Sequence, residues 1–285
     1  MTPPPVVEVE DLRFRYPTGR DDALRGLSFT LRRGEVFGLL GPSGTGKSTA
    51  VGVITGVLAG FRGRVTVLGE PGPADRRRLA RIGVGFEVPA LYARLTAREN
   101  LVLFAALHRT RDVDVDGLLG RVGLHGQADR RVEQFSKGMK SRLDLCRALL
   151  GTPELLFLDE PTAALDPGHA KVVRELVRSF ADAGGSVLLT THDMHVAEAI
   201  CDQVGLLVDG RFVACDAPRA LRATGGPPQV EITFVDGAPV TTELTALADD
   251  ASLRASLRSG RVRSVHTCEP TLEDVFLELT GRSLA

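Results

Sequence analysis

The chain has 285 residues, with 35 Lys and Arg against 36 Asp and Glu, which leaves a formal net charge of −1. This balance provides no broad cationic face, so we expect no nucleic-acid partner. A hydrophobic fraction of 43% excludes disordered and collagen-like chains and is typical of a protein with a buried core.

Neither a membrane span nor a disulfide framework is expected from the pattern. The apolar runs are far shorter than the ~20 residues of a spanning helix. The N-terminal sequence MTPPPVVEVED lacks the basic and apolar regions of a secretory signal, which favours cytosolic synthesis. The cysteines show no CxxC spacing, so we expect free thiols and no zinc site: Cys146, Cys201, Cys215 and Cys268.

Two kinds of strand are predicted, and they differ in their apolar pattern. Residues 6–14 and 27–31 alternate apolar and polar positions, as strands of a half-exposed antiparallel layer do. Four later runs are continuously apolar and suit parallel strands that are buried on both faces: 35–40, 81–86, 155–158 and 186–191. The pattern predicts an α/β fold with an N-terminal antiparallel β layer.

Helices and a boundary account for the rest of the chain. Between residues 88 and 150 strand signals disappear, and a capping box from Thr96 to Glu99 begins a helix. The segment GGPPQ after Thr224 interrupts the chain, so we predict domains of residues 1–224 and 225–285, with a helical subdomain at about 88–150. The small α+β C-terminal domain should hold a strand, a helix and a final amphipathic helix: 230–235, 244–259, and the helix bearing Leu272, Val275, Phe276 and Leu279.

The most informative motif is GPSGTGKST at residues 41–49, which matches GxxxxGK[ST] between a predicted strand and a helix-forming run. Its glycines allow backbone N–H groups to face a phosphate. Lys47 supplies a point charge for the β- and γ-phosphates, and the Ser48 hydroxyl can bind Mg²⁺. The alternative, an incidental glycine-rich turn, fits this placement between a strand and a helix poorly. The motif therefore predicts nucleotide binding through Gly41, Pro42, Ser43, Gly44, Thr45, Gly46, Lys47, Ser48 and Thr49.

Two carboxylates, Asp159 and Glu160, follow the predicted strand at 155–158. In P-loop enzymes such an Asp holds the Mg²⁺ shell, and a neighbouring Glu polarises the attacking water. The alternative is that Glu160 and Pro161 only form a turn at a strand end, which the nearby phosphate motif disfavours. We predict Asp159 as a metal-binding residue and Glu160 as the general base.

Together with FSKGM at residues 135–139, these motifs resemble the ATP-binding subunits of ABC transporters over residues 6 to about 222. FSKGM is similar to the family's LSGGQ signature, in a variant found in drug and antibiotic exporters. The resemblance implies a P-loop NTPase (ABC ATPase) core that binds ATP and Mg²⁺. It also implies that Ser136 and Gly138, at a helix N-terminus, face the γ-phosphate bound to a second subunit.

The same resemblance assigns roles to three further residues. Tyr16 resembles the aromatic residue that stacks on adenine, with an ordinary surface aromatic as the alternative. Asp166, within ALDP at 164–167, is similar to the loop that contacts the second subunit. His192 resembles the switch histidine that reaches the γ-phosphate, with a satisfied core histidine as the alternative.

Two residues depart from the family pattern. Glu87 stands where the family usually has a Gln that contacts Mg²⁺ and the lytic water. A carboxylate can also donate an oxygen to a hard cation, so we predict catalytic and metal-binding roles for Glu87. Lys137 replaces the middle glycine of the signature and adds a cation there.

The tail EPTLEDVFLELTGR at residues 269–282 is similar to the end of daunorubicin-resistance ATPases, which favours export over import. The resemblance implies an ATP hydrolase that powers a separate integral membrane permease and exports drugs, antibiotics or other small amphipathic compounds. It also implies a homodimer of ATPase subunits, peripheral on the cytoplasmic face of the cell membrane. The alternative is a soluble ABC-type ATPase that acts as a scaffold or regulatory factor without a membrane partner.

Overall fold

The computed structural model describes residues 4–73, 75–108, 110, 113–163, 165–226, 229–248 and 251–281. The chain divides into two units, and the first ends at Ala217. This boundary precedes the predicted division at 224/225 because α8 (Pro218–Arg222) packs against α10 (Leu272–Thr280) of the second unit. The Arg222 side chain strengthens that packing by donating a hydrogen bond of 2.8 Å to the Pro270 carbonyl oxygen.

An antiparallel sheet forms the N-terminal layer of the first unit. Its strand order is β2-β1-β4-β5. The strands are β1 (Val7–Phe14), β2 (Leu24–Leu31), β4 (Arg62–Val67) and β5 (Glu70–Pro71). The first two strands are antiparallel and half-exposed, as predicted, although β2 begins at Leu24 instead of residue 27. The strands β4 and β5 were not predicted, because β4 has three exposed positions and little apolar pattern.

A six-stranded sheet of order β10-β9-β3-β8-β7-β6 forms the centre of the first unit. Its strands are β3 (Val36–Leu40), β6 (Ile82–Gly85), β7 (Leu155–Asp159), β8 (Ser186–Thr191), β9 (Gln203–Val208) and β10 (Arg211–Asp216). The four strands predicted to be parallel are parallel, and β9 joins them beside β3. The strand β10 is antiparallel to β9. The α/β fold class is therefore confirmed.

The main core lies where the two sheets and α1 (Lys47–Ile54) meet. Phe29 of β2 stacks on Phe37 of β3, with ring centroids 4.7 Å apart. The buried side chains of Ala50, Val53 and Ile54 bring α1 into the same cluster. This packing holds the start of α1 directly beyond the end of β3. The helices α6 (Pro167–Asp182) and α7 (Met194–Ile200) connect the later strands.

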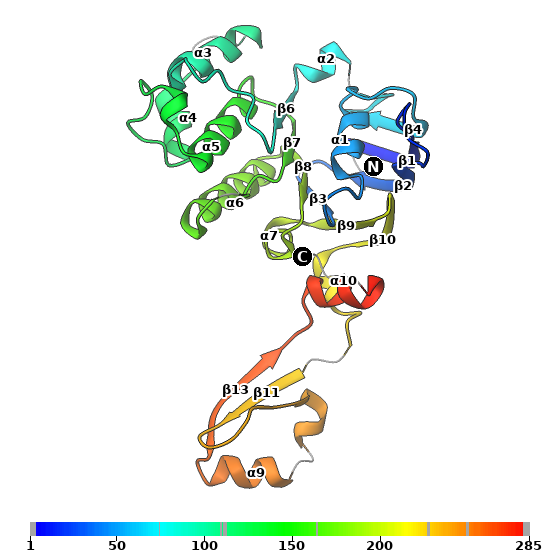
Figure 1. The fold of residues 1–285 in the computed structure, drawn as a ribbon, viewed down its shortest axis with the longest axis vertical. Helices are drawn as coiled ribbons and strands as arrows, with labels where there is room; N and C mark the ends of the chain where they lie inside the picture. The colour runs from blue at the N-terminus through cyan, green and yellow to red at the C-terminus, as the bar shows by residue number, and fades with distance from the viewer. Residues whose placement is uncertain are drawn as a thin grey trace. The chain divides into compact units, whose positions relative to one another are not determined.

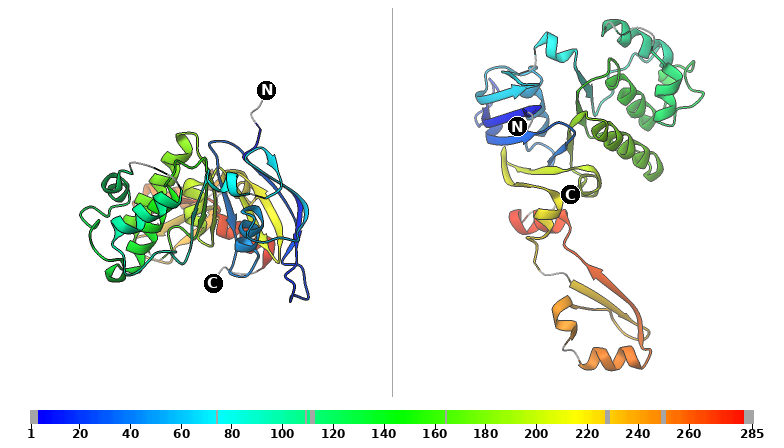
Figure 2. Two further views of the ribbon diagram at one scale, coloured as in Figure 1. Left: turned by 90° about the horizontal axis from the view of Figure 1, so that it is seen from above. Right: turned by 180° about the vertical axis from the view of Figure 1, so that it is seen from behind.

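The segment between β6 and β7 is helical, as the sequence pattern predicts. It contains α3 (Ala97–Leu107), α4 (Val115–Arg121), the short 3₁₀ turn η1 (Val132–Gln134) and α5 (Lys137–Ala148). The predicted capping box is present at Thr96 and Glu99. These helices lie on one side of the central sheet, and β1, β2 and α1 lie on the other (Figures 1 and 2). A further short helix, α2 (Arg76–Leu79), precedes β6.

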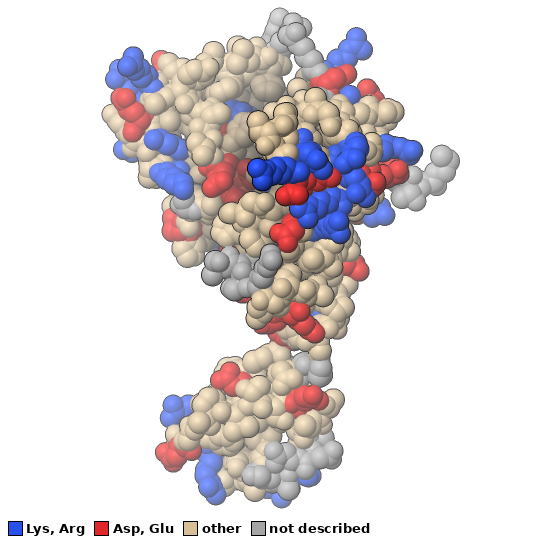
Figure 3. Space-filling view, turned by 45° about the vertical axis from the view of Figure 1, so that its right-hand side comes forward, with Lys and Arg blue, Asp and Glu red and all other residues tan. Residues whose placement is uncertain are grey.

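The outer face of the N-terminal layer carries arginines that are paired with acids. Arg15 and Arg62 lie 2.7 and 3.1 Å from the Asp22 carboxylate, and Arg13 lies 2.8 Å from Asp11. Figure 3 shows Lys and Arg interspersed with Asp and Glu on this side of the molecule. The ion pairs therefore offset much of the positive charge of these arginines.

The second unit holds a three-stranded sheet of order β12-β11-β13. Its strands are β11 (Gln229–Phe234), β12 (Val240–Glu243) and β13 (Val262–Cys268). The continuous helix predicted over 244–259 is wrong: a 3₁₀ helix η2 (Leu244–Ala248) and α9 (Ala251–Arg258) occupy this range, with residues 249 and 250 outside the described part. In α10, Leu272, Val275 and Phe276 are buried, whereas Leu279 is 50% exposed and does not belong to the buried face.

Two further expectations concern the cysteines and membrane-spanning helices. The four cysteines are free thiols, with Cys146 and Cys201 buried and Cys215 and Cys268 exposed. Within the described ranges, no helix combines the length and the apolar character that crossing a membrane requires.

Candidate active site

A cleft of about 470 Å³ opens where β3, β6, β7 and β8 end. The carboxyl ends of parallel strands meet at one edge of a sheet, and the loops that follow them build such sites. The cleft is lined by Tyr16, Ala23, Ser43, Gly44, Gly46, Lys47, Ser48, Thr49, Glu87, Asp159, Glu160 and His192. Segments more than a hundred residues apart thus share one cavity.

The loop between β3 and α1 presents backbone N–H groups to this cleft. Gly46 precedes α1 with a φ of 109°, and a Cβ there would lie 2.9 Å from the Ala23 carbonyl oxygen, so only glycine suits the position. No side chain caps α1 and no acidic residue occupies its first turn. The first N–H groups of the helix, with the positive end of its dipole, are therefore free to bind an anion.

Lys47 is held inside this loop. Its Nζ donates hydrogen bonds of 2.6 Å to the Gly41 oxygen and 3.0 Å to the Pro42 oxygen. Burial lowers the pKa of Lys47, while the charges of Glu160, Asp159 and Glu87 oppose that shift. Thr45 braces the same loop by donating a 2.9 Å hydrogen bond to Pro42. The cation is thus positioned against three carboxylates.

Asp159 ends β7 and faces the loop. Its Oδ2 lies 3.5 Å from the Ser48 hydroxyl oxygen, and its Oδ1 accepts a short hydrogen bond from Thr190. The threonine orients the carboxylate, and it was not predicted as a site residue. The signal was present in the sequence, because Thr190 directly precedes the Thr191-His192 pair at the end of a buried strand.

Glu160 is held by the end of β8. Its Oε2 accepts a 3.1 Å hydrogen bond from the Thr191 hydroxyl, and its Oε1 lies 2.8 Å from His192 Nδ1. The backbone of Glu160 has a φ of 48°, which is rare for a residue with a side chain and is tolerated where the surroundings enforce it. Hydrogen bonds on both oxygens fix the direction in which this carboxylate can accept a proton.

Tyr16 and Glu87 occupy the rim of the cleft. The Tyr16 hydroxyl lies 3.0 Å from Thr49 Oγ1, and its ring packs edge-on against Phe14 with centroids 5.0 Å apart. Tyr16 is 40% exposed, so part of the residue remains available to a ligand. Glu87 follows β6, is exposed, and faces the cleft beside Asp159 and Glu160.

Six predicted residues do not line this cleft: Gly41, Pro42 and Thr45, which lie in the loop between β3 and α1, and Ser136, Gly138 and Asp166, which lie apart from it. Ser136 is the N-cap of α5, where its hydroxyl accepts a 3.2 Å hydrogen bond from the Met139 N–H. Asp166 is the N-cap of α6, and its hydrogen bond with the His169 side chain lowers the pKa of Asp166 to about 2. Ala164, which belongs to the same predicted loop, lies outside the described residues.

Comparisons with known proteins agree with this geometry. A family model described as ABC transporter matches residues 24–163. The chain is 43% identical to the fluoroquinolones export ATP-binding protein of Mycobacterium tuberculosis (strain ATCC 25618 / H37Rv), over 98% of this chain and 94% of that protein. The chain belongs to the ABC transporter family.

Further comparisons place this ABC ATPase more closely. It is 39% identical to the Nod factor export ATP-binding protein I of Rhizobium sp. (strain N33), over 92% of this chain and 93% of that protein. A solved ATP-binding subunit of an ABC transporter matches with a TM-score of 0.67 and 31% identity, over 77% of this chain and 92% of that one. A dimeric ATP-binding cassette bound to ADP and Pi matches with a TM-score of 0.66 and 25% identity, over 74% and 98%. The chain is an ABC-type ATP hydrolase of the exporter type.

Proposed function

We propose that this ABC ATPase binds ATP and Mg²⁺ in the cleft, closes as a homodimer over two nucleotides, and powers a separate membrane permease that exports small amphipathic compounds. The observation that carries the proposal is that the predicted site residues of one chain lie in two separate places. The phosphate loop and both catalytic carboxylates share one cleft, whereas Ser136 lies at an exposed helix N-terminus outside that cleft. A second copy is what would bring such a residue to the phosphates.

The cleft fits the phosphates and the adenine of ATP. The phosphates belong on the loop around Lys47, where the uncapped start of α1 offers N–H groups. The adenine belongs on the half-exposed ring of Tyr16, because a flat aromatic surface stacks on a base. The volume of about 470 Å³ is sufficient for a nucleotide-sized ligand.

The residues of the cleft also fit Mg²⁺. The Ser48 hydroxyl and the Asp159 carboxylate lie 3.5 Å apart and provide the hard oxygen donors that Mg²⁺ prefers. Across the described ranges, no three His, Cys, Asp or Glu side chains are grouped so that they could hold a metal ion by themselves. When bound there, Mg²⁺ would neutralise charge on the phosphates.

Hydrolysis would use Glu160 as the general base. The carboxylate accepts a proton from water, the water oxygen bonds to the γ-phosphorus, and the bond from that phosphorus to the bridging oxygen breaks, which releases ADP and phosphate. His192 and Thr191 hold Glu160 by its two oxygens, so its basic lone pairs keep a fixed direction. Lys47 would stabilise negative charge on the transferred group.

Export and the permease are supported by two observations. The relatives compared above are export ATP-binding proteins for fluoroquinolones and Nod factors. In addition, an apolar cleft of about 370 Å³ adjoins the ATP site and shares Ser48 and Asp159 with it. Exposed Val57, Leu79 and Phe86 contribute to this cleft, which suits an apolar segment of a membrane subunit. The ATPase would then be peripheral on the cytoplasmic face of the membrane.

The variant Glu160→Gln tests the proposal. With ATP and Mg²⁺ we expect it to accumulate as a dimer in size-exclusion chromatography, because ATP is bound but not hydrolysed. The same variant with ADP is the control and should remain monomeric. A variant that stays monomeric with ATP and Mg²⁺ would contradict the closed dimer.

Co-purification of the tagged wild-type chain in detergent tests the permease: the recovery of no integral membrane protein would favour a soluble ABC ATPase.

A further inference from the structure

The helix α5 packs directly on β6, the strand that ends two residues before Glu87. Gly83 makes this approach possible, because a Cβ at that position would lie 1.9 Å from the Ala148 carbonyl oxygen. Interiors packed this closely transmit displacements instead of absorbing them. A movement of α5 is therefore expected to move β6.

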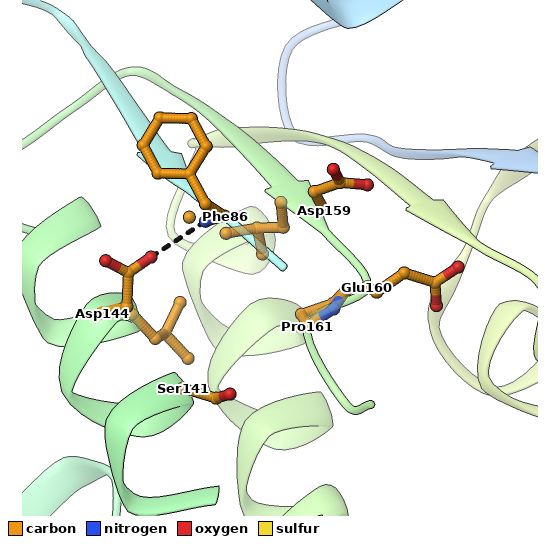
Figure 4. A pocket seen from close by; sticks show the side chains of 9 residues that line it. Phe86, Ser141, Asp144, Asp159, Glu160 and Pro161 are labelled. Carbon is orange, nitrogen blue, oxygen red and sulfur yellow. Dashed lines mark hydrogen bonds between the residues drawn. The ribbon is translucent and has the colours of Figure 1, made fainter. Parts of the chain in front are cut away.

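Two charged side chains of α5 hold the end of β6 by its backbone. Asp144 Oδ2 accepts a 2.9 Å hydrogen bond from the Phe86 N–H, and Arg147 Nη2 donates a 2.7 Å hydrogen bond to the Val84 oxygen. The two side chains are joined by a 2.8 Å hydrogen bond from Arg147 Nε to Asp144 Oδ1. In Figure 4 Asp144 points from its helix toward the Phe86 backbone, across the pocket from Asp159 and Glu160. The chain is thus held on both sides of Gly85.

Aromatic rings fix the arginine in this position. The Arg147 guanidinium carbon lies 5.3 Å from the centroid of Phe86 and 5.1 Å from that of Phe104 in α3. Contacts of this kind are attractive when the cation is shielded from water, and the Arg147 side chain is only 10% exposed. Asp144 is 1% exposed, so the ion pair is buried, with hydrogen bonds from both partners to the backbone.

A second buried arginine on α5 has a different role. Arg142 Nη1 donates hydrogen bonds of 2.9 and 3.0 Å to the oxygens of Val122 and Gly123, which lie just after α4. Arg142 therefore joins α5 to its own helical segment, whereas Arg147 joins α5 to the central sheet. The two arginines offer a matched pair for experiment, with similar burial on one helix and different partners.

We propose that Asp144 and Arg147 are positioning residues that couple Ser136, at the N-terminus of α5, to Glu87 in the cleft of the same chain. The inference rests on the proposed closed dimer, in which Ser136 covers the ATP of the other copy. A shift of α5 on that ATP moves the backbone of residues 84–86, and Glu87 changes its position beside Asp159 and Glu160. Each chain thereby links its own nucleotide site to that of its partner, which makes the two sites cooperative.

A single tryptophan reports the position of the Glu87 segment. The chain contains no Trp, and Val88 is 81% exposed, so Val88→Trp places one fluorophore beside Glu87. In a Glu160→Gln background we expect ATP and Mg²⁺ to change its emission. Asp144→Asn and Arg147→Lys should each remove more than about half of this change, because lysine cannot contact Val84 and Asp144 together. The control Arg142→Lys should keep the full change.

The kinetics of proteins that retain Glu160 provide the second readout. Two coupled sites allow a Hill coefficient of up to about 2, and we expect it to fall toward 1 in Asp144→Asn and Arg147→Lys but not in Arg142→Lys. ATP affinity of the isolated subunit should change by less than about twofold, since neither residue lines the nucleotide cleft. Thermal unfolding shows whether Asp144→Asn or Arg147→Lys has lost its fold. If one has, the result for the other variant tests the coupling.

The outcomes separate this inference from the proposed function. If Glu160→Gln dimerises and the reporter responds fully in both Asp144→Asn and Arg147→Lys, the coupling is wrong while the closed dimer stands. Equal losses in Arg142→Lys would show that any weakening of α5 suffices, which also overturns the specific role of the pair. If the Glu160→Gln protein never dimerises with ATP and Mg²⁺, the closed dimer fails, and the inference fails with it.

Discussion

The start of α1 and the start of α5 are both helix N-termini suited to phosphate, but they are placed very differently. The first N–H groups of α1 have no side-chain cap and face a concave cleft that already holds Lys47 and three carboxylates. The N-terminus of α5 is capped by its own Ser136 and is exposed, apart from that cleft. One region is a nearly complete binding site, and the other is a surface that needs a ligand brought to it. In the proposed dimer, each chain would therefore carry a phosphate site of its own and a cover for the site of the other copy.

A mixing experiment tests most directly whether Lys47 of one chain and Ser136 of another chain act on the same ATP. Lys47→Ala removes the cation of the phosphate loop, and Ser136→Asp preserves the N-cap of α5 while placing a negative charge where a phosphate should bind. Each variant alone should lose at least about 100-fold in ATPase rate. In a mixture roughly half of the dimers pair the two variants, and each has one intact composite site, so up to about a quarter of the wild-type rate should return.

Steady-state ATPase assays of the separate and mixed proteins measure this effect. Ser136→Asn is the control, because asparagine caps a helix as well as aspartate does but carries no charge. It should lose much less activity than Ser136→Asp. A mixture as inactive as its two components would mean that the loop and the signature act within one chain.

Glu87 allows a second, smaller test on the cleft side of the comparison. Glu87→Gln removes one of the three carboxylates whose charge acts on Lys47, and with it some attraction for a cation. ATP binding should persist, while the half-saturating Mg²⁺ concentration in ATPase titrations rises by about two- to fivefold, as suits an exposed charge. Glu87→Asp keeps the charge and should stay near wild type. Identical Mg²⁺ titrations for Glu87→Gln and wild type would refute a metal role.

The smallest expected effect concerns the junction between the helical segment that contains α5 and the central sheet. Glu154 precedes β7, where the helical segment rejoins the sheet. A 2.7 Å hydrogen bond from Arg81 and a second from Arg33 lower the pKa of Glu154 to about 2. A carboxyl pKa that is depressed by folding adds stability above its unfolded value near 4.5, and this stability is lost as the pH falls toward 2.

Denaturation midpoints of wild type and Glu154→Gln at several pH values measure this contribution. Because the side chain is 34% exposed, solvent screening limits it to below about 1 kcal/mol. The difference between the two proteins should be largest near neutral pH and should shrink between pH 4.5 and 2. A difference that grows on acidification would mean that the ion pair does not stabilise the junction.

Several parts of the fold could not be predicted from local pattern, for identifiable reasons. The strand β4 has three exposed positions and no apolar run, and β12 is mostly exposed, so neither carries a strand signal. The 3₁₀ helix η2 was predicted as part of an α-helix because the apolar residues Leu244 and Leu247 have helical spacing. The boundary at Ala217 depends on packing between α8 and α10, which are 50 residues apart in sequence and meet only in the folded unit.

By itself, the sequence determined the parallel strands β3, β6, β7 and β8, the glycine-rich loop between β3 and α1, and the positions of Asp159 and Glu160 at the end of β7, because each depends on a short run of residues and its local backbone preference. Tertiary structure alone decided that Thr190, Thr191 and His192 hold those carboxylates, since the contacts join the ends of two neighbouring strands. It also decided that Asp144 and Arg147 hold the end of β6. Backbone hydrogen bonds from a helix to a distant strand depend on how the two pack, and no periodicity in either segment specifies that.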